Sequence, residues 1–404
     1  MNQISGSARW KRIFFLLAVG VVVGWIFTLL LPDPDATAEE VRQSANDSPA
    51  DTFASSQPVT VASASEPETA GIPPSPTSVD AILIARFDAA AVQLARGIDR
   101  QDAQALLADL ADSVAAADSI IAAQSLIAFL ETGRDAVTGL GFQVAEGGTL
   151  SEAPSLRVAT LDFLGRTGAP QAADYAIEVM DATAVADEYS VALRNLAWGV
   201  EDTSEVGSRF SDMLDRDAWL SEPTAGFMEA FDVAVAVGGP QMVRELSQVV
   251  LGESEIPTGE TPLLNQPAFI ALDRLVMRDP DAVVEAFRSD PELLSWAPTQ
   301  RASLLSRLDV RNKDQRTLLE NYLLSPNHGP DEMGYFENIF PNVNGIDGNR
   351  LVTESTEIRN VAEIDNATRA VLTEWQGDSR FAGVRPILET IAQRLNQNSG
   401  PQQP

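Results

Sequence analysis

The sequence predicts an all-α domain that a linker joins to a single membrane-spanning helix. Three observations indicate this organisation. Residues 13–31 are uniformly apolar, residues 32–78 are rich in proline and serine, and apolar residues recur at helical spacing from Val79 onward. No segment shows the convincing alternation of apolar and polar residues that is typical of a half-buried strand. We therefore expect an exported domain built from helices.

The apolar segment reads IFFLLAVGVVVGWIFTLLL and contains nineteen residues without a charge. As a helix rising ~1.5 Å per residue it is about 28 Å long, close to the hydrocarbon thickness of a bilayer. Arg9, Lys11 and Arg12 precede it, and acidic residues follow it. Because basic residues favour the cytoplasmic side, we expect residues 1–12 to be cytoplasmic and the chain after residue 31 to be exported.

Two properties of this segment leave alternatives open. Gly20, Gly24 and Thr28 share one helix face, and small residues at this spacing form dimer contacts between membrane helices. A homodimer is therefore one expectation, although glycine is also simply common in membrane spans. Ala36-Thr37-Ala38 fits the cleavage rule for signal peptides. The apolar segment is longer than the ~7–15 residues usual there, which favours a retained anchor.

The exported part is strongly acidic. It holds all 58 acidic residues but only 25 of the 28 basic ones, which gives a formal charge of −33. Such a surface repels phosphate and anionic lipid, so the composition argues against nucleic-acid binding and against a domain lying flat on the membrane. Solubility, adaptation to a salty environment and an acidic surface for a basic partner or divalent cations all fit this charge.

Several chemistries are excluded by residue type. The absence of cysteine removes disulfides, thiol nucleophiles and cysteine-ligated zinc. His328 is the only histidine, so two-histidine metal sites are excluded, and the chain has no GxxxxGK[ST] or GxSxG motif. Asn342–Asn349 has the wrong glycine position for a calcium loop of the EF-hand type. We expect no catalytic residues, no metal site and no cofactor.

Residues 32–78 are expected to be a disordered acidic tether, because proline and like charges oppose folding. The N-terminal helical part, residues 79–150, follows. Its alanine-rich segments predict three helices, which are Val79–Arg96, Gln101–Ala117 and Asp118–Arg134. The glycine-rich stretch 139–148 separates them from the next section.

Residues 151–325 contain a recurring helical hairpin. Ser155–Asp181 reads SLRVATLDFLGRTGAPQAADYAIEVMD, with one apolar face on each side of the turn Gly168-Ala169-Pro170. The pattern recurs around Pro240 and Pro280, and an aspartate lies eight, eight and seven residues before the respective turn prolines. These aspartates are Asp162, Asp232 and Asp273. Further helices are expected at Glu188–Val200, Glu205–Leu214, Thr299–Arg307 and Asp314–Leu324.

This hairpin resembles a HEAT-type repeat, with a short turn, a proline that begins the second helix and alanine-rich packing positions. The arginine expected late in the second helix is not consistently placed, so TPR-like pairing stays open. Either resemblance implies a stacked helical solenoid that binds proteins or peptides along one surface, without catalysis.

Residues 326–365 are expected to form a long polar loop, and a loop of this length is often functional. The candidate interaction residues in it are His328, Tyr335, Phe336, Phe340, Asn344 and Asp347. Helices resume within residues 366–397, at Asn366–Gln376 and Val384–Leu395, and a tail of residues 398–404 ends the chain.

These observations predict a bacterial inner-membrane protein with a single span and a periplasmic domain. We expect it to act as a scaffold or adaptor for another envelope protein, with the bilayer contacted through residues 13–31. Two other functions stay open. One is an envelope hydrolase that uses a carboxylate pair on a glycan, and the other is a self-associating structural protein.

Overall fold

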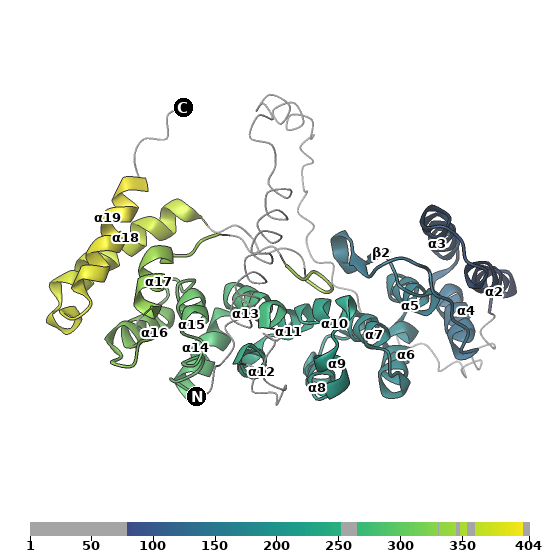
Figure 1. Ribbon diagram of the computed structural model, residues 1–404, viewed down its shortest axis with the longest axis horizontal. Helices are drawn as coiled ribbons and strands as arrows, with labels where there is room; N and C mark the ends of the chain where they lie inside the picture. Colours follow the sequence, from purple (N-terminus) through teal and green to yellow (C-terminus); the bar gives the residue numbers. More distant parts are fainter. Residues whose placement is uncertain (1–78, 252–264, 330, 345–347, 354–359, 399–404) are drawn as a thin grey trace, which may run out of the picture. The chain divides into compact units, whose positions relative to one another are not determined.

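The computed structural model describes residues 79–251, 265–329, 331–344, 348–353 and 360–398 (Figure 1). These residues are almost entirely helical, which confirms the all-α prediction for this part of the chain. The predicted membrane segment with Gly20, Gly24 and Thr28, the linker and Asp347 lie outside the described residues. Among the helices that the structure describes, none has the length and apolar character needed to cross a membrane.

Three helices begin the described part and agree with prediction within a few residues. Each is capped by an aspartate whose carboxylate accepts backbone N–H groups of the first turn. Their apolar faces meet around Phe87, whose ring centroid lies 5.3 Å from that of Phe129 and 6.2 Å from that of Phe163. The helices are α2 Ala81–Ala95, α3 Arg100–Ala115 and α4 Ser119–Glu131.

Two short strands follow, contrary to the expectation that the chain has none. β1 (Gln143–Val144) pairs antiparallel with β2 (Leu150–Glu152), and the 3-10 turn η2 (Glu146–Gly148) joins them. Gly147 and Gly148 have φ of +72° and +75°, a conformation that glycine adopts without steric cost. Strands of two and three residues are too short to produce an alternating pattern, which explains why the sequence did not reveal them.

The predicted hairpins around Pro170 and Pro280 are confirmed, and both prolines are the first residue of their helix. The stripe Phe227–Val235, predicted as one helix, is instead divided into two short helices at Ala230 and Phe231. The helices of this section are α5 Leu156–Arg166, α6 Pro170–Ala182, α7 Ala186–Gly199, α8 Ser204–Leu214, α9 Asp217–Ser221, α10 Ala225–Glu229, α11 Asp232–Val237, α12 Gly239–Leu251, α13 Asn265–Arg278 and α14 Pro280–Ser289.

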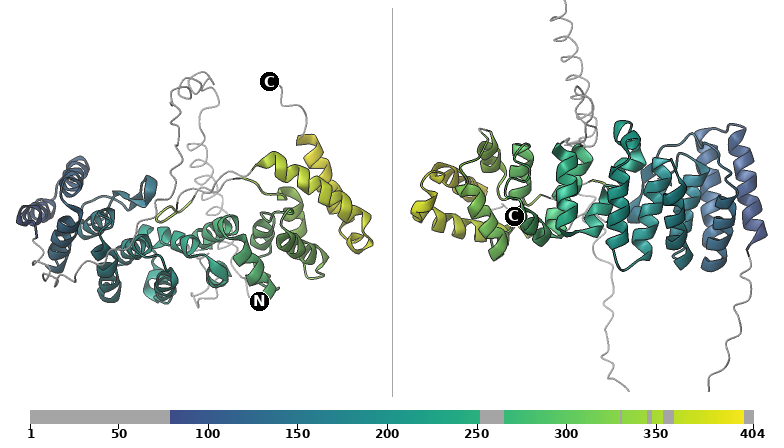
Figure 2. Two further views of the ribbon diagram at one scale, coloured as in Figure 1. Left: turned by 180° about the vertical axis from the view of Figure 1, so that it is seen from behind. Right: turned by 90° about the horizontal axis from the view of Figure 1, so that it is seen from below.

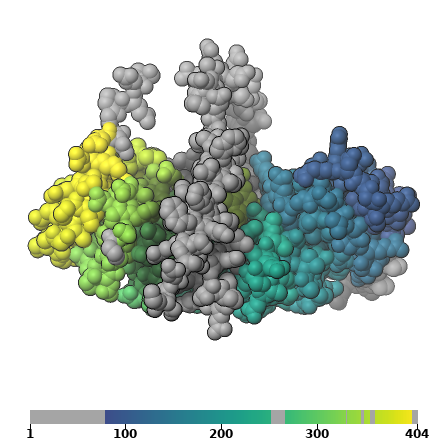
Figure 3. Space-filling view, viewed as in Figure 1, coloured from purple at the N-terminus to yellow at the C-terminus, as the bar shows by residue number. Residues whose placement is uncertain are grey.

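Successive hairpins contact one another in chain order. Among the first helices, α5 contacts α7, α11 contacts α13, and α13 contacts the later helix α15 (Pro298–Leu305). Among the second helices, α12 contacts α14, and α14 contacts α16 (Lys313–Leu324). Neighbouring colours along the chain therefore lie side by side in the ribbon views (Figure 2), and the coloured surfaces of the space-filling view follow the same order (Figure 3).

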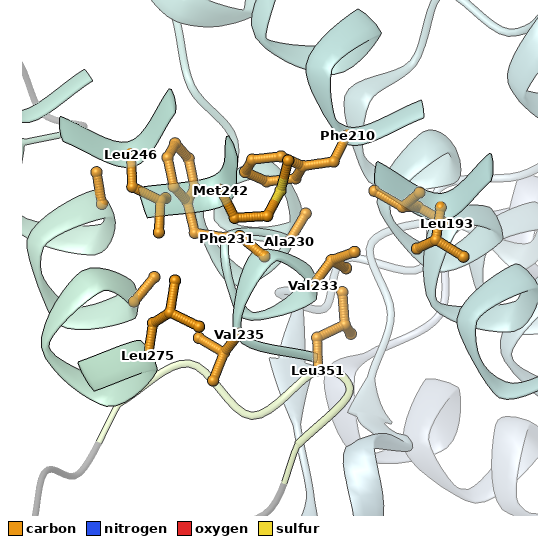
Figure 4. Close-up of a cluster of buried hydrophobic side chains, with 14 of the residues drawn as sticks. Leu193, Phe210, Ala230, Phe231, Val233, Val235, Met242, Leu246, Leu275 and Leu351 are labelled. Atoms are coloured by element: carbon orange, nitrogen blue, oxygen red, sulfur yellow. The ribbon is translucent and has the colours of Figure 1, made fainter. Parts of the chain in front are cut away.

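The segment 326–365 is not the long polar loop that the sequence predicts. It contains α17 (Glu332–Ile339), and α18 (Val361–Gly377) begins five residues before the expected Asn366. A 3-10 turn, η3 (Ser379–Phe381), and α19 (Arg385–Asn398) complete the chain. Phe336 and Phe340 are fully buried, and Leu351 belongs to the buried cluster that Figure 4 shows with residues of α11. Described residues of this segment therefore contribute to the core.

Candidate functional site

Buried ion pairs connect the first helices of successive hairpins. The three aspartates that precede the turn prolines form these pairs with arginines further along the chain, and none of the six side chains is more than 9% exposed. A buried pair is stable only when its remaining hydrogen-bonding groups are also satisfied. The pairs are Asp162 Oδ1–Arg194 Nη1 at 2.7 Å, Asp232 Oδ1–Arg274 Nη1 at 2.6 Å and Asp273 Oδ1–Arg307 Nε at 2.5 Å.

The remaining groups of the Asp232–Arg274 pair bind a non-helical segment, residues 348–353, which we call the strap. Arg274 Nη1 donates to the carbonyl of Asn349. Asp232 Oδ2 accepts the backbone N–H groups of Val352 and Thr353, both at 2.7 Å. The pair thus holds the strap backbone with the arginine on a carbonyl and the aspartate on amides, and the Thr353 hydroxyl contacts both side chains.

The same scheme holds the β1–β2 hairpin. Arg194 Nη1 donates to the carbonyl of Gly148 at 2.7 Å, and Asp162 Oδ1 accepts the N–H of Leu150 at 3.0 Å. The third arginine, Arg307, donates to the carbonyl of Asn344 at 2.7 Å. The row of ion pairs therefore binds peptide backbone repeatedly, and within the described residues that backbone comes from this chain.

Burial shifts the pKa of three residues in these pairs, Asp232, Asp273 and Arg194. Burial raises the pKa of Asp232 above its ordinary value, although Arg274 and the strap amides favour the charged form. Burial also raises the pKa of Asp273, and it lowers the pKa of Arg194. The desolvation of both partners means that each charge depends strongly on the other.

A second candidate region is a cavity of about 330 Å³ between α14, α15 and α16. Charged side chains of Arg288, Glu292 and Asp314 line it together with apolar ones. The apolar lining comes from Val284, Phe287, Leu305, Leu318 and the ring of Tyr322. The lining thus combines apolar contact area with a few groups able to orient a ligand.

The turn beside this cavity exposes a tryptophan. Trp296 is 83% exposed and lies four residues after Glu292, which lines the cavity. Leu294, in the same turn, is buried with φ of +59°, a left-handed conformation that is an outlier for a bulky residue. Such strain persists only where the surrounding structure fixes it, and it occurs often at functional sites. Trp296 was not predictable from the sequence, because a single aromatic residue in a turn has no periodicity.

The candidate residues of segment 326–365 do not form one exposed site. The prediction that Phe336 and Phe340 are surface contacts is wrong. Their rings stack inside the core with centroids 4.8 Å apart. His328 is half-buried, and its Nε2 lies 2.7 Å from the Tyr322 carbonyl. Tyr335 is 41% exposed on α17, and Asn344 is exposed while its carbonyl binds Arg307.

Acidic residues are numerous but dispersed. Among the residues that the structure describes, no three His, Cys, Asp or Glu side chains lie close enough together to hold a metal ion. The candidate regions are therefore the row of ion pairs and the cavity beside Trp296. No protein-family model, no curated protein and no solved structure matches this chain.

Proposed function

We propose that this protein is a scaffold of the bacterial cell envelope whose exported domain binds another envelope protein. The hairpins contact one another in chain order, which supports a stacked repeat of the HEAT-like or TPR-like kind. The apolar run of residues 13–31, with basic residues before it, supports an inner-membrane anchor and a periplasmic domain. The repeats provide the binding surface, and the anchor and tether hold it at the membrane.

The observation that carries this proposal is the exposure of Trp296, which lies in the same turn as Pro291 and Glu292 of the cavity lining. Tryptophan is enriched among the few residues that dominate the energy of protein interfaces. Leaving this ring in water forgoes the free energy that burying its apolar surface would provide. The adjoining cavity of about 330 Å³ is large enough for an anchoring side chain of the partner.

Site-specific photo-crosslinking in cells tests this interface. A photoreactive phenylalanine derivative replaces Trp296 in the full-length protein, and the same derivative replaces Ile82, which is 73% exposed on α2, as the control. We expect a discrete crosslinked partner from position 296 and none from position 82. Identical products at both positions, or no product at position 296, would contradict the proposed interface.

Trp296→Ala is expected to weaken binding of that partner by about 30-fold or more, equivalent to about 2 kcal/mol. The unfolding midpoint of the protein should not change, because the ring is mostly exposed in the free protein. Affinity is measured with the purified partner and the full-length protein in mild detergent, and Ile82→Ala serves as the matched control. An affinity equal to that of the control would exclude Trp296 as the centre of the interface.

A further inference from the structure

A smaller cavity of about 200 Å³ lies between α3, α5 and β2. Apolar side chains of Leu107, Ala108, Ala111 and Phe163 line it, together with the charged residues Glu152, Asp162 and Arg166. A typical small-molecule site measures about 300–1,000 Å³. This cavity is therefore better suited to one or two side chains of a peptide.

Only one of the two carboxylate oxygens of Asp162 accepts hydrogen bonds. Oδ1 accepts hydrogen bonds from Arg194 Nη1 and from the N–H of Leu150. Oδ2 is buried and has no hydrogen-bond partner among the described residues. Arg166 Nη1 lies 3.6 Å from Oδ2, an ion-pair contact that is too long for a hydrogen bond. A buried carboxylate oxygen without a hydrogen bond is rare, and each case calls for a physical explanation.

Arg166 is the complementary group at this cavity. Its side chain is 38% exposed, and its guanidinium group lies over the Phe163 ring, 5.6 Å from the centroid. The only ion pair that it makes with a described residue is the long contact to Asp162. Two residues that line the cavity therefore carry groups without a hydrogen-bond partner among the described residues, which are Oδ2 of Asp162 and the guanidinium group of Arg166.

The strap shows what an aspartate–arginine combination of this kind binds in the same protein. Both oxygens of Asp232 accept hydrogen bonds, with Oδ1 bound to Arg274 and Oδ2 to two strap amides. Arg274 in turn donates to a strap carbonyl. At Asp162 the β-hairpin uses only Oδ1, so Oδ2 and Arg166 have the composition of a second backbone-binding pair.

We propose that the cavity of α3, α5 and β2 binds an extended, uncharged peptide segment of a partner protein. A backbone N–H of the segment donates to Asp162 Oδ2, a backbone carbonyl accepts from Arg166, and a small apolar side chain fills the cavity. A cationic ligand is disfavoured because Arg194 pairs with Asp162, Arg100 pairs with Glu152, and Arg166 adds a positive charge. This site rests on the proposed protein-binding role and adds a contact separate from Trp296.

A synthetic peptide tests the site directly. The probe is fluorescein-labelled Gly-Asn-Ala-Leu-Val-Thr-amide, the strap sequence with its arginine replaced by alanine, and binding to the full-length protein in mild detergent is followed by fluorescence polarisation. Ala108→Leu fills the cavity, and Arg166→Ala removes the donor. We expect each to weaken binding by about tenfold or more. Ala105→Leu, on an exposed position of α3 outside the cavity lining, should change binding less than about twofold.

A second probe separates backbone recognition from simple apolar contact. N-methylation of the valine and threonine amides removes the N–H donors and should weaken binding to the unmodified protein by about tenfold. Equal binding of the methylated peptide, equal binding to the Ala108→Leu variant, or no binding below millimolar concentration would overturn the proposal. Trp296→Ala should leave this peptide affinity unchanged, so failure at one site is distinguishable from failure at the other.

Discussion

Arg274→Met is expected to lower the free energy of unfolding by about 3–5 kcal/mol. The substitution keeps most of the apolar volume but leaves the Asp232 carboxylate, which is fully buried, without its cation. The strap also loses the donor to the Asn349 carbonyl. The measurement is urea unfolding of the full-length protein, followed by circular dichroism at 222 nm.

The matched control is Arg288→Met, which removes an arginine from an exposed ion pair. Arg288 and Glu285 are 60% and 51% exposed, and their pair is 2.7 Å long. Exposed pairs contribute only about 0–1 kcal/mol, so this variant should unfold close to the unmodified protein. If both variants lost a similar amount of unfolding free energy, the buried Asp232–Arg274 pair would contribute no more to stability than an exposed pair.

The loss of unfolding free energy caused by Arg274→Met should also depend on pH. Burial already raises the pKa of Asp232, and removing Arg274 removes an interaction that lowers it, so the pKa rises further. A folded-state pKa above the unfolded value means that the folded protein binds more protons between the two values, and its relative stability increases as pH falls. We expect the difference between the variant and the unmodified protein to shrink as the pH is lowered from about 7 toward 4. A constant difference would show that the protonation of Asp232 does not differ between the two proteins over this pH range.

The local elements of this fold were predictable because their signals are local. A proline at the first position of the second helix, preceded by Gly168 in one turn and by Asp279 in the other, predicted α5–α6 and α13–α14 together with apolar residues at helical spacing on both sides. The spacing of the three aspartates was visible as well, but their partners were not. Arg194 lies 32 residues beyond Asp162, and Arg274 lies 42 residues beyond Asp232. In sequence a buried arginine such as Arg274 is indistinguishable from an exposed one such as Arg288.

The strap was not predictable for a different reason. Its attachment to Asp232 and Arg274 uses mainly backbone N–H and carbonyl groups, which every residue carries and which therefore leave no sequence signal. Leu351 is buried and Val352 packs against the core, and two adjacent apolar residues in a polar stretch do not indicate burial. The composition of segment 326–365 consequently suggested a loop. Interactions between backbone and side chain, rather than hydrophobic periodicity, order this part of the chain.

The contact between the strap and the β1–β2 turn predicts a difference between two adjacent glycines. Gly147 and Gly148 both have left-handed φ, so replacing either with alanine should cost about 1–2 kcal/mol of stability. A Cβ at Gly147 would meet nothing within 4 Å, whereas a Cβ at Gly148 would overlap the carbonyl oxygen of Leu351. We expect Gly148→Ala to cost an additional ~1–3 kcal/mol, measured by the same urea unfolding.

Combining each glycine variant with Arg274→Met shows why Gly148→Ala should cost more stability than Gly147→Ala. With Arg274 removed, the strap loses one of its attachments and Leu351 can move away from the new Cβ. Gly148→Ala should then cost little more than Gly147→Ala, so the two substitutions are non-additive, as expected for residues that share a contact. If the extra cost of Gly148→Ala persisted in full, it would arise from another neighbour, such as the Trp198 ring 3.0 Å from the Cβ position. The cycle therefore measures whether the Asp232–Arg274 pair holds the strap against the β-hairpin turn.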